Sequence, residues 1–225
     1  TKLILRILGH RKDVPSSLEK KDWMESVVLS VLNASTEVLT EIFFLACPET
    51  EIALQTLVLL TLDEQNRREV LDSEFVPALL ANLNQLKVVD SNMLMYMVQV
   101  VENLLCTPGA LQTEAETLLT DCFDMLQYVS NPPLLYSILT NIRTLTQYGP
   151  KVRDEDVLVV ATLLSNADET VVVYSLLILA NLARNRGMVV LMQRCLDNAV
   201  LASLSAGTST IVRTLVTQLK YMLSI

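Results

Sequence analysis

Hydrophobic and polar positions repeat along this chain at an interval of about 40 residues, the length of one unit in helical repeat proteins. The clearest copy is Val172–Arg184, an apolar stretch without Gly or Pro that has little polar surface apart from Tyr174, Asn181 and Arg184. This composition predicts a helix that other segments cover on most sides. Comparable stretches open at four other positions, Leu54, Tyr96, Tyr136 and Arg213.

The pattern predicts an all-α chain of four to five repeats, in which a short helix, a longer helix and a most apolar helix follow one another. The approximate repeat boundaries are 17–62, 63–106, 110–148, 152–185 and 187–225. Residues 1–9 read as the tail of a preceding unit, and the sequence starts without Met. We therefore expect residues 1–225 to form a single repeat domain that belongs to a longer protein.

Capping and breaking residues set the helix boundaries. Asn131 followed by Pro132 and Pro133 is typical of a helix start, and Thr107–Gly109 reads as a stop. Such signals predict helices at about 17–33, 37–46, 49–62, 64–71, 74–86, 91–106, 114–129, 132–148, 154–165, 170–185, 188–195, 198–205 and 210–225. The pair Arg186–Gly187 is expected to end the most apolar helix.

The composition is apolar, with 51% hydrophobic and 19% charged residues. Charged residues usually make up about a quarter of a globular protein, so the values favour long helices buried on several sides. The most apolar windows, 157–164 and 171–183, are separated by Asn166, Asp168 and Glu169. Neither window approaches the roughly 20 residues that a membrane helix needs, so no membrane span is predicted.

The net charge of −8 argues against nucleic-acid binding, because phosphates are bound by basic surfaces and the basic runs of this chain are no longer than doublets, such as Lys20–Lys21 and Arg67–Arg68, with acids beside them. The four cysteines, Cys47, Cys106, Cys122 and Cys195, form no C-x-x-C pair and lie in or beside apolar stretches. We predict buried, reduced thiols in an intracellular protein of the cytoplasm, the nucleus or both.

Catalytic motifs are missing from the sequence. The single histidine, His10, has no evident Ser or Cys partner, and no phosphate-binding glycine loop or zinc motif is present. The carboxylates of Asp154, Glu155 and Asp156 are expected to complement the positive end of a helix rather than to hold a metal ion. We therefore predict a protein that is not an enzyme and that has no cofactor and no metal site.

The last residues of the most apolar predicted helix match a known family motif. Leu179–Ala183 reads Leu-x-Asn-Leu-Ala, and Val101–Leu105 is a looser copy of the same motif. Together with the period and the helix order, these motifs resemble the armadillo repeat, with HEAT-like divergence, over about residues 49–225. The resemblance implies a right-handed α-solenoid of three-helix repeats that binds a peptide segment of a partner protein in its concave groove.

In that family the Asn of the third helix, with the positions four and seven before it, lines the groove. Carried over to this sequence, the implied groove residues are Tyr96, Gln99, Asn103, Tyr136, Leu139, Arg143, Tyr174, Leu177, Asn181, Arg213 and Lys220, with Val216 in the remaining position. The Trp slots of importin-type arrays hold other residues here, so binding of nuclear-localisation signals is not expected.

The residue types suit an interaction surface. An Asn amide can bind a partner's main chain, Tyr is a frequent interface anchor, and Arg143 and Lys220 favour an acidic partner, extended or helical. A structural alternative stays open, in which the tyrosines pack between repeats and Asn181 caps or bridges adjacent helices. On the groove hypothesis, Arg143→Glu with Asn181→Ala weakens partner binding and leaves thermal stability nearly unchanged.

A second function is compatible with the same fold. The last helix ends on Tyr221, Met222, Leu223 and Ile225, and no polar helix follows it in the sequence. An array with apolar ends can self-associate and serve as a rigid spacer or platform. The scaffold or adaptor function and this homo-oligomeric function are separable by light scattering.

Overall fold

The computed structural model describes residues 48–73, 75–86, 92–129 and 131–224. Within these ranges all regular structure is helical. The chain divides into two compact units, of which the first ends at Ala110 and the second begins at Leu111. The helices predicted at 17–33 and 37–46, together with His10 and Cys47, lie outside the described residues.

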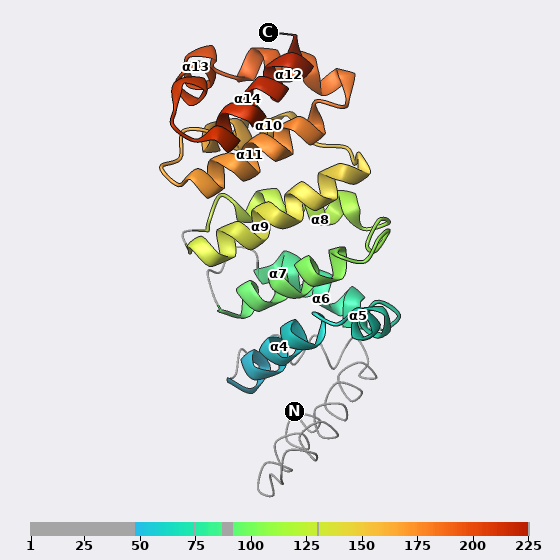
Figure 1. Cartoon of the computed structure of the whole chain (residues 1–225). Coiled ribbons are helices and arrows are strands. Elements are labelled where there is room, and N and C mark those ends of the chain that lie inside the picture. The colour runs from blue at the N-terminus through green and yellow to red at the C-terminus, as the bar shows by residue number, and fades with distance from the viewer. Residues whose placement is uncertain (1–47, 74, 87–91, 130, 225) are drawn as a thin grey trace, which may run out of the picture. The chain divides into compact units, whose positions relative to one another are not determined.

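Between residues 48 and 110, the described part of the first unit consists of one three-helix repeat and the last helix of the repeat before it. Its helices are α4 (Pro48–Leu60), α5 (Glu64–Leu71), α6 (Phe75–Leu86) and α7 (Asn92–Leu105). The last helix, α7, packs against α4 and α6, and α5 contacts both α6 and α7 (Figure 1). This arrangement confirms the predicted order of a short helix, a longer helix and a third helix for residues 63–106.

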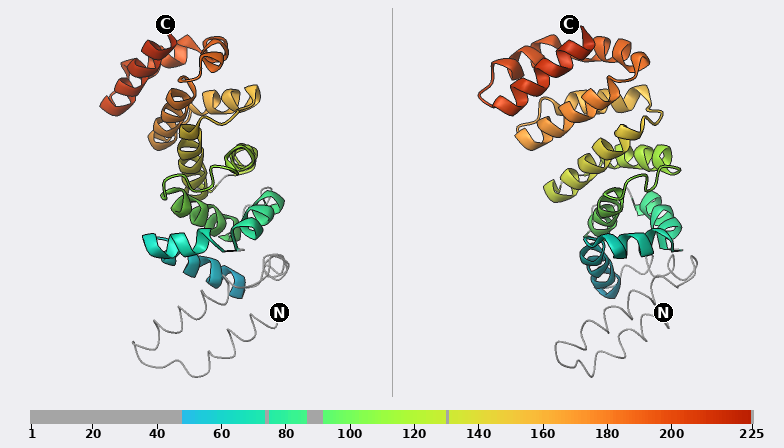
Figure 2. Two further views of the ribbon diagram at one scale, coloured as in Figure 1. Left: turned by 90° about the vertical axis from the view of Figure 1, so that its right-hand side faces the viewer. Right: turned by 45° about the vertical axis from the view of Figure 1, so that its right-hand side comes forward.

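The second unit is built in two layers. Its elements are α8 (Ala115–Met125), α9 (Pro132–Leu145), the 3₁₀ turn η2 (Thr146–Tyr148), α10 (Asp154–Leu163), α11 (Glu169–Leu182), α12 (Arg186–Cys195), α13 (Asn198–Ala206) and α14 (Thr210–Leu223). The helices α9, α11 and α14 lie side by side in one layer, and α8, α10 and α13 pack behind them (Figures 1 and 2). α12 contacts α10 and α14.

Two repeats of the second unit have two helices instead of three. Residues 107–114 form turns, with φ of +78° at Gly109 and +56° at Leu111, and Gly149 has φ of +69°. Pro108 and Pro150 lie beside these glycines, and neither residue type favours a helix interior. A short first helix is therefore absent from the described parts of repeats 110–148 and 152–185, while α12 supplies it in repeat 187–225.

Side-chain caps fix most helix starts in the second unit. The carboxylates of Asp168 and Asp197 accept from the amides of Thr170 at 2.8 Å and Ala199 at 2.7 Å. The prediction that Arg186–Gly187 ends a helix is wrong, because Asn185 caps a new helix there and its carbonyl accepts from the Gly187 amide at 2.9 Å.

The most apolar helix, α11, forms the centre of the second unit. It contacts α9, α10 and α14, seven of its residues are buried on one side, and the other residues between Val171 and Leu182 are half-buried. The sequence prediction of a helix covered on most sides is thereby confirmed. Among the described residues, no helix combines the length and apolarity required to cross a membrane.

Candidate partner-binding surface

All residues of the predicted groove lie on the third helices of the repeats, α7, α9, α11 and α14. Each of these helices has 14 residues, which corresponds to a length of about 21 Å at the usual helical rise. In the second unit, α9, α11 and α14 present equivalent positions in successive repeats. Hydrogen bonds between neighbouring third helices, described below, recur near the ends of these helices.

On α9 and α11, one side of the layer is accessible to solvent. Its exposed or partly exposed side chains, which we call the third-helix surface, are Tyr136, Thr140, Arg143, Thr144, Tyr174, Leu177, Asn181 and Arg184. Along each helix these residues are three or four positions apart and therefore share a face. Five of the eleven predicted groove residues belong to this surface, where a partner could reach them.

Leu139 is a correction to the predicted groove. Its side chain is 0% exposed and lies in the core, so it is not available to a partner. Ile138 and Ile142, on the same side of α9, are equally buried. Thr140, one residue further along, takes the outward position instead. The residue four positions before the Asn slot is therefore buried on α9, where it is Leu139, and partly exposed on α11, where it is Leu177.

Asn181 connects two adjacent third helices. Its side-chain nitrogen donates to the main-chain oxygen of Arg143 at 3.0 Å and to the hydroxyl of Thr146 at 3.2 Å. Asn103 makes the same pair of bonds in the first unit, to the oxygen of Val58 at 2.9 Å and to the hydroxyl of Thr61 at 3.0 Å. The structure thus confirms that Asn181 bridges neighbouring helices.

The threonines of these bridges were missed at the sequence level. Thr61 and Thr146 are buried, and each hydroxyl also donates to a carbonyl of its own helix end, at 2.7 Å to Leu57 and at 2.9 Å to Arg143. The available signal was their position: each occurs near the end of a third helix, and the Asn of the next third helix follows 42 or 35 residues later.

Tyr136 makes a second connection between α9 and α11. Its hydroxyl donates to the carboxylate of Asp168, the residue that caps the start of α11. This hydrogen bond, followed by partial burial, raises the pKa of Tyr136. The same bond, with the amide of Thr170, lowers the pKa of Asp168. The Tyr136 side chain is thus both partly exposed and part of the junction between repeats.

Three further residues of the predicted groove lie in the first unit. Tyr96, Gln99 and Asn103 are all partly exposed on α7. Near the opposite end of the α4–α7 pair, the Asn92 amide donates to the carboxylate of Glu51 at 3.1 Å. The Asn103 bridge and the Asn92 contact therefore join α7 to α4 near both ends of the two helices.

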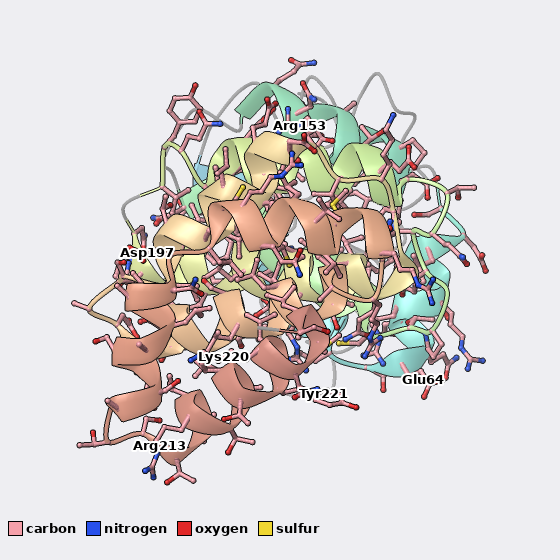
Figure 3. The ribbon with its side chains drawn as sticks, turned by 90° about the horizontal axis from the view of Figure 1, so that it is seen from above. Glu64, Arg153, Asp197, Arg213, Lys220 and Tyr221 are labelled. Carbon is pink, nitrogen blue, oxygen red and sulfur yellow. The ribbon has the colours of Figure 1, made fainter. Side chains whose placement is uncertain are left out.

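The last helix, α14, departs from this arrangement. Lys220 occupies the Asn slot, and its amine donates to the Ser205 hydroxyl of α13 at 3.3 Å, within its own repeat. Arg213 is exposed and donates to the Thr210 hydroxyl at 3.2 Å. Figure 3 shows Arg213 and Tyr221 projecting from α14 on the side of the second unit that lies opposite Arg153. Val216, at the intermediate position, is buried.

Arg153 forms an ionic cluster away from the third-helix surface. Its guanidinium binds Asp156 at 2.7 Å and Asp124 of α8 at 2.9 Å, and Glu155 lies within 3.3 Å. The two Asp carboxylates raise the pKa of Arg153. Asp156 is 3% exposed and also accepts from the Arg153 amide at 3.1 Å, which closes a capping box at the start of α10. These carboxylates thus serve to join α8 to α10.

The cysteines differ in accessibility. Cys122 is buried, and burial, with a smaller contribution from Asp121, raises the pKa of its thiol. Cys106 is exposed, so the prediction of a buried thiol is wrong at this position, because the chain turns outward directly after α7. Cys195 is half-buried. All three are free thiols.

No protein-family model matches the sequence, and a search of curated proteins gives no match. Solved structures do match. A designed armadillo repeat protein in complex with a (KR)4 peptide has a TM-score of 0.65 and 13% identity, covering 99% of this chain and 98% of its own. The fold is an armadillo-like helical repeat.

Two further solved structures are similar to this chain over nearly its whole length. A computationally designed armadillo repeat protein for modular peptide recognition has a TM-score of 0.66 and 13% identity, with 98% of both chains covered. An engineered protein has a TM-score of 0.66 and 13% identity, with 100% of this chain and 97% of its own covered. At this level of identity the similarity establishes the fold alone. The armadillo-like resemblance inferred from Leu179–Ala183 and from the period is thereby confirmed.

Proposed function

We propose that this chain is a non-catalytic protein-interaction module, a scaffold or adaptor, that binds a peptide segment of a partner protein on the third helices of its repeats. One observation carries the proposal. Tyr136 and Arg143 on α9 face the same side as Tyr174 and Leu177 on the adjoining α11, and all four side chains are at least partly exposed. Tyrosine, leucine and arginine on one rigid layer provide both apolar anchors and charged contacts.

The solved neighbours support a binding function of this kind. One was solved with a (KR)4 peptide, and another was designed for modular peptide recognition. The ionisable groups whose pKa values are shifted make structural contacts among the described residues. Arg153 pairs with Asp124 of α8, Tyr136 on α9 donates to Asp168 at the start of α11, and the thiol of Cys122 is buried.

Site-specific photo-crosslinking tests the proposal. A benzophenone amino acid replaces Leu177 on the third-helix surface, and in a matched variant it replaces Leu158, which is 47% exposed on α10. We expect cross-linked partner peptides at position 177 when the protein is irradiated in an extract of its source cells and analysed by mass spectrometry. Equal capture at both positions, or capture only at 158, contradicts binding on the third helices.

Self-association is the second candidate, and the exposure of α14 is the observation in its favour. Tyr221 is 86% exposed and Ile211 is 62% exposed. The exposed residues between them, including Thr214, Thr217 and Gln218, are polar, whereas homodimer interfaces are usually more apolar. The partner-binding proposal is therefore the better supported of the two. Light scattering that shows a monomer over a wide concentration range would eliminate the self-association function.

A further inference from the structure

Four polar side chains of the third-helix surface, those of Tyr136, Thr140, Thr144 and Asn181, donate their hydrogen bonds within the protein. The Tyr136 hydroxyl donates to Asp168. The hydroxyl of Thr140 donates to the main-chain oxygen of Tyr136 at 2.9 Å, and that of Thr144 to the oxygen of Thr140 at 3.0 Å. A hydroxyl has one proton to donate, so each of these oxygens can only accept a further bond.

Asn181 has the same limitation. Its amide nitrogen faces the Arg143 carbonyl and the Thr146 hydroxyl, so both N–H groups are engaged. The orientation of the amide follows from chemistry, because a main-chain carbonyl can only accept and the nitrogen must therefore be the atom that faces it. What Asn181 can offer to a partner is its carbonyl oxygen. Tyr136, Thr140, Thr144 and Asn181 thus present acceptors on this surface.

Arg143 and Arg184 are the charged residues of this surface, and the Asp168 carboxylate beside Tyr136 lies at the other ends of the two helices. Arg143 is the only charged residue between Asp124 and Lys151 in the sequence, and Arg184 follows Glu169 with no charge between them. Arg184 lies one helical turn beyond Asn181, which itself contacts Arg143, so the two arginines belong to neighbouring positions on adjacent helices. Within the described residues, no carboxylate forms an ion pair with either arginine. In a chain of net charge −8, this is a local cationic site.

We propose that the third-helix surface of α9 and α11 selects an extended, carboxylate-bearing segment of the partner. Carboxylates pair with Arg143 and Arg184, and main-chain N–H groups donate to Asn181, Thr140 and Tyr136. A helical segment could supply the carboxylates, but its own main-chain N–H groups are engaged inside the helix. An extended segment supplies both. The inference rests on the proposed function and adds to it the charge and conformation of the partner.

A basic partner is disfavoured by the same groups. The designed neighbour solved with a (KR)4 peptide shares the fold. In this chain Arg143 and Arg184 would face such a peptide with like charge, which opposes association. The (KR)4 peptide is therefore a useful negative probe, and its tight binding on this surface would overturn the inference.

The test starts from a displayed library of random 12-residue peptides, selected on the full chain. We expect enriched sequences rich in Asp and Glu. Their affinity should fall about tenfold or more in Arg143→Glu/Arg184→Glu, because two favourable charge pairs become repulsive. The matched control is Lys151→Glu/Arg194→Glu, which changes the net charge equally at two exposed cations elsewhere and should alter affinity by less than about twofold.

A second arm tests the conformation of the bound peptide. N-methylation of alternate residues in a selected peptide removes main-chain donors while the side chains stay in place, and we expect about a tenfold loss of affinity. Acid-poor binders, or acidic binders that bind as helices and tolerate N-methylation, would overturn the inference while the proposed function stands. If no selected peptide protects α9 and α11 from hydrogen exchange, the proposed function fails and the inference fails with it.

Discussion

The side-chain amide of Asn181 on α11 donates to the main-chain oxygen of Arg143 at the end of α9, at 3.0 Å. A carbonyl near the end of a helix lacks an amide donor from the next turn, and the oxygen of Arg143 instead accepts from Asn181 and from the Thr146 hydroxyl. Asn103 does the same for Val58 in the first unit. The Asn that the family resemblance assigned to partner binding is thus also a structural bridge between consecutive third helices.

Asn181→Ala is therefore expected to destabilise the second unit. Loss of the two hydrogen bonds should lower the free energy of unfolding by about 1–3 kcal/mol, while the bond from the Thr146 hydroxyl to the Arg143 oxygen remains. Hydrogen exchange of the α9 and α11 amides measures this effect locally. Asn198→Ala, at an exposed position on α13, is the control and should change stability by less than about 0.5 kcal/mol.

This expectation revises the combined variant suggested by the sequence. Arg143→Glu with Asn181→Ala was predicted to leave thermal stability nearly unchanged, but Asn181 bears two hydrogen bonds between helices. Arg143→Glu alone is the cleaner probe of binding, since the bond to Asn181 uses the main chain of Arg143 and not its side chain. Equal protection of α9 and α11 in Asn181→Ala and the wild type would contradict a structural contribution of the bridge.

The two leucines of the predicted groove differ in burial and should differ in their contribution to stability. Leu139 is 0% exposed, so Leu139→Ala leaves a cavity and should cost about 2–5 kcal/mol of stability. Leu177 is partly exposed, and Leu177→Ala should cost about 1 kcal/mol because less apolar area is lost from the interior. Urea unfolding followed by circular dichroism measures both. Similar costs for the two variants would contradict the inward position of Leu139.

The ion cluster at Arg153 gives a prediction of its own. Arg153→Met removes the partner of Asp156, which is 3% exposed, and leaves a buried carboxylate uncompensated. Breaking a fully buried pair costs about 3–5 kcal/mol, and we expect about 2 kcal/mol here because the Arg153 side chain keeps 39% of its exposure. Arg68→Ala is the matched control, since its pair with Glu64 is exposed and should contribute less than about 0.5 kcal/mol. Urea midpoints of the two variants should differ clearly.

The sequence predicted correctly those features that depend on the residues of a single helix. The apolar stretch at Val172–Arg184 predicted a covered helix, and Asn131 with two prolines predicted the start of α9, because composition and local backbone chemistry decide both. The direction of Leu139 and the bridge from Asn181 to Thr146 depend on how neighbouring helices are rotated and spaced. The rotation and spacing of neighbouring helices cannot be inferred from the identity of any single residue.

The same limit explains the errors at helix boundaries. Arg186–Gly187 looked like a helix end because Gly is common there. Asn185 reverses that reading, since its side chain caps the Gly187 amide and starts α12. The missing first helices of two repeats follow from turns at Gly109 and Gly149, whose positive φ angles require a residue that tolerates them. At residues 185–187 the side-chain hydrogen bond of Asn185 determined that a helix starts there instead of ending.

Thiol reactivity should follow the accessibility of each cysteine. Cys106 is exposed and should be alkylated by iodoacetamide in the native protein. Cys122 is buried and its pKa is raised, so it should react only when the second unit opens. Peptide mapping by mass spectrometry, with and without urea, distinguishes the two sites. Rapid labelling of Cys122 under native conditions would show that α8 is not packed as described.

The hydrogen bond between Tyr136 and Asp168 should make the junction of α9 and α11 sensitive to acid. The pKa of Asp168 is lowered, first by Tyr136 and then by the Thr170 amide. The bond therefore contributes stability above the unfolded pKa of about 3.9, and that contribution is lost as the pH falls through the lower folded pKa. The pKa of Tyr136 is raised, so on the alkaline side the contribution is complete below about 10 and is lost above it.

Tyr136→Phe tests this sign directly. The variant should be less stable than the wild type near pH 7, and the difference should shrink as the pH falls through the acidic range, because protonated Asp168 no longer favours the bond in the wild type. In the variant, carboxyl-detected NMR should show the pKa of Asp168 moving up towards its usual value. Tyr128→Phe, at a 55% exposed tyrosine, is the control and should leave the Asp168 titration unchanged. A stability difference that is constant from neutral to strongly acidic pH would show that Tyr136 stabilises this junction through packing instead of through Asp168.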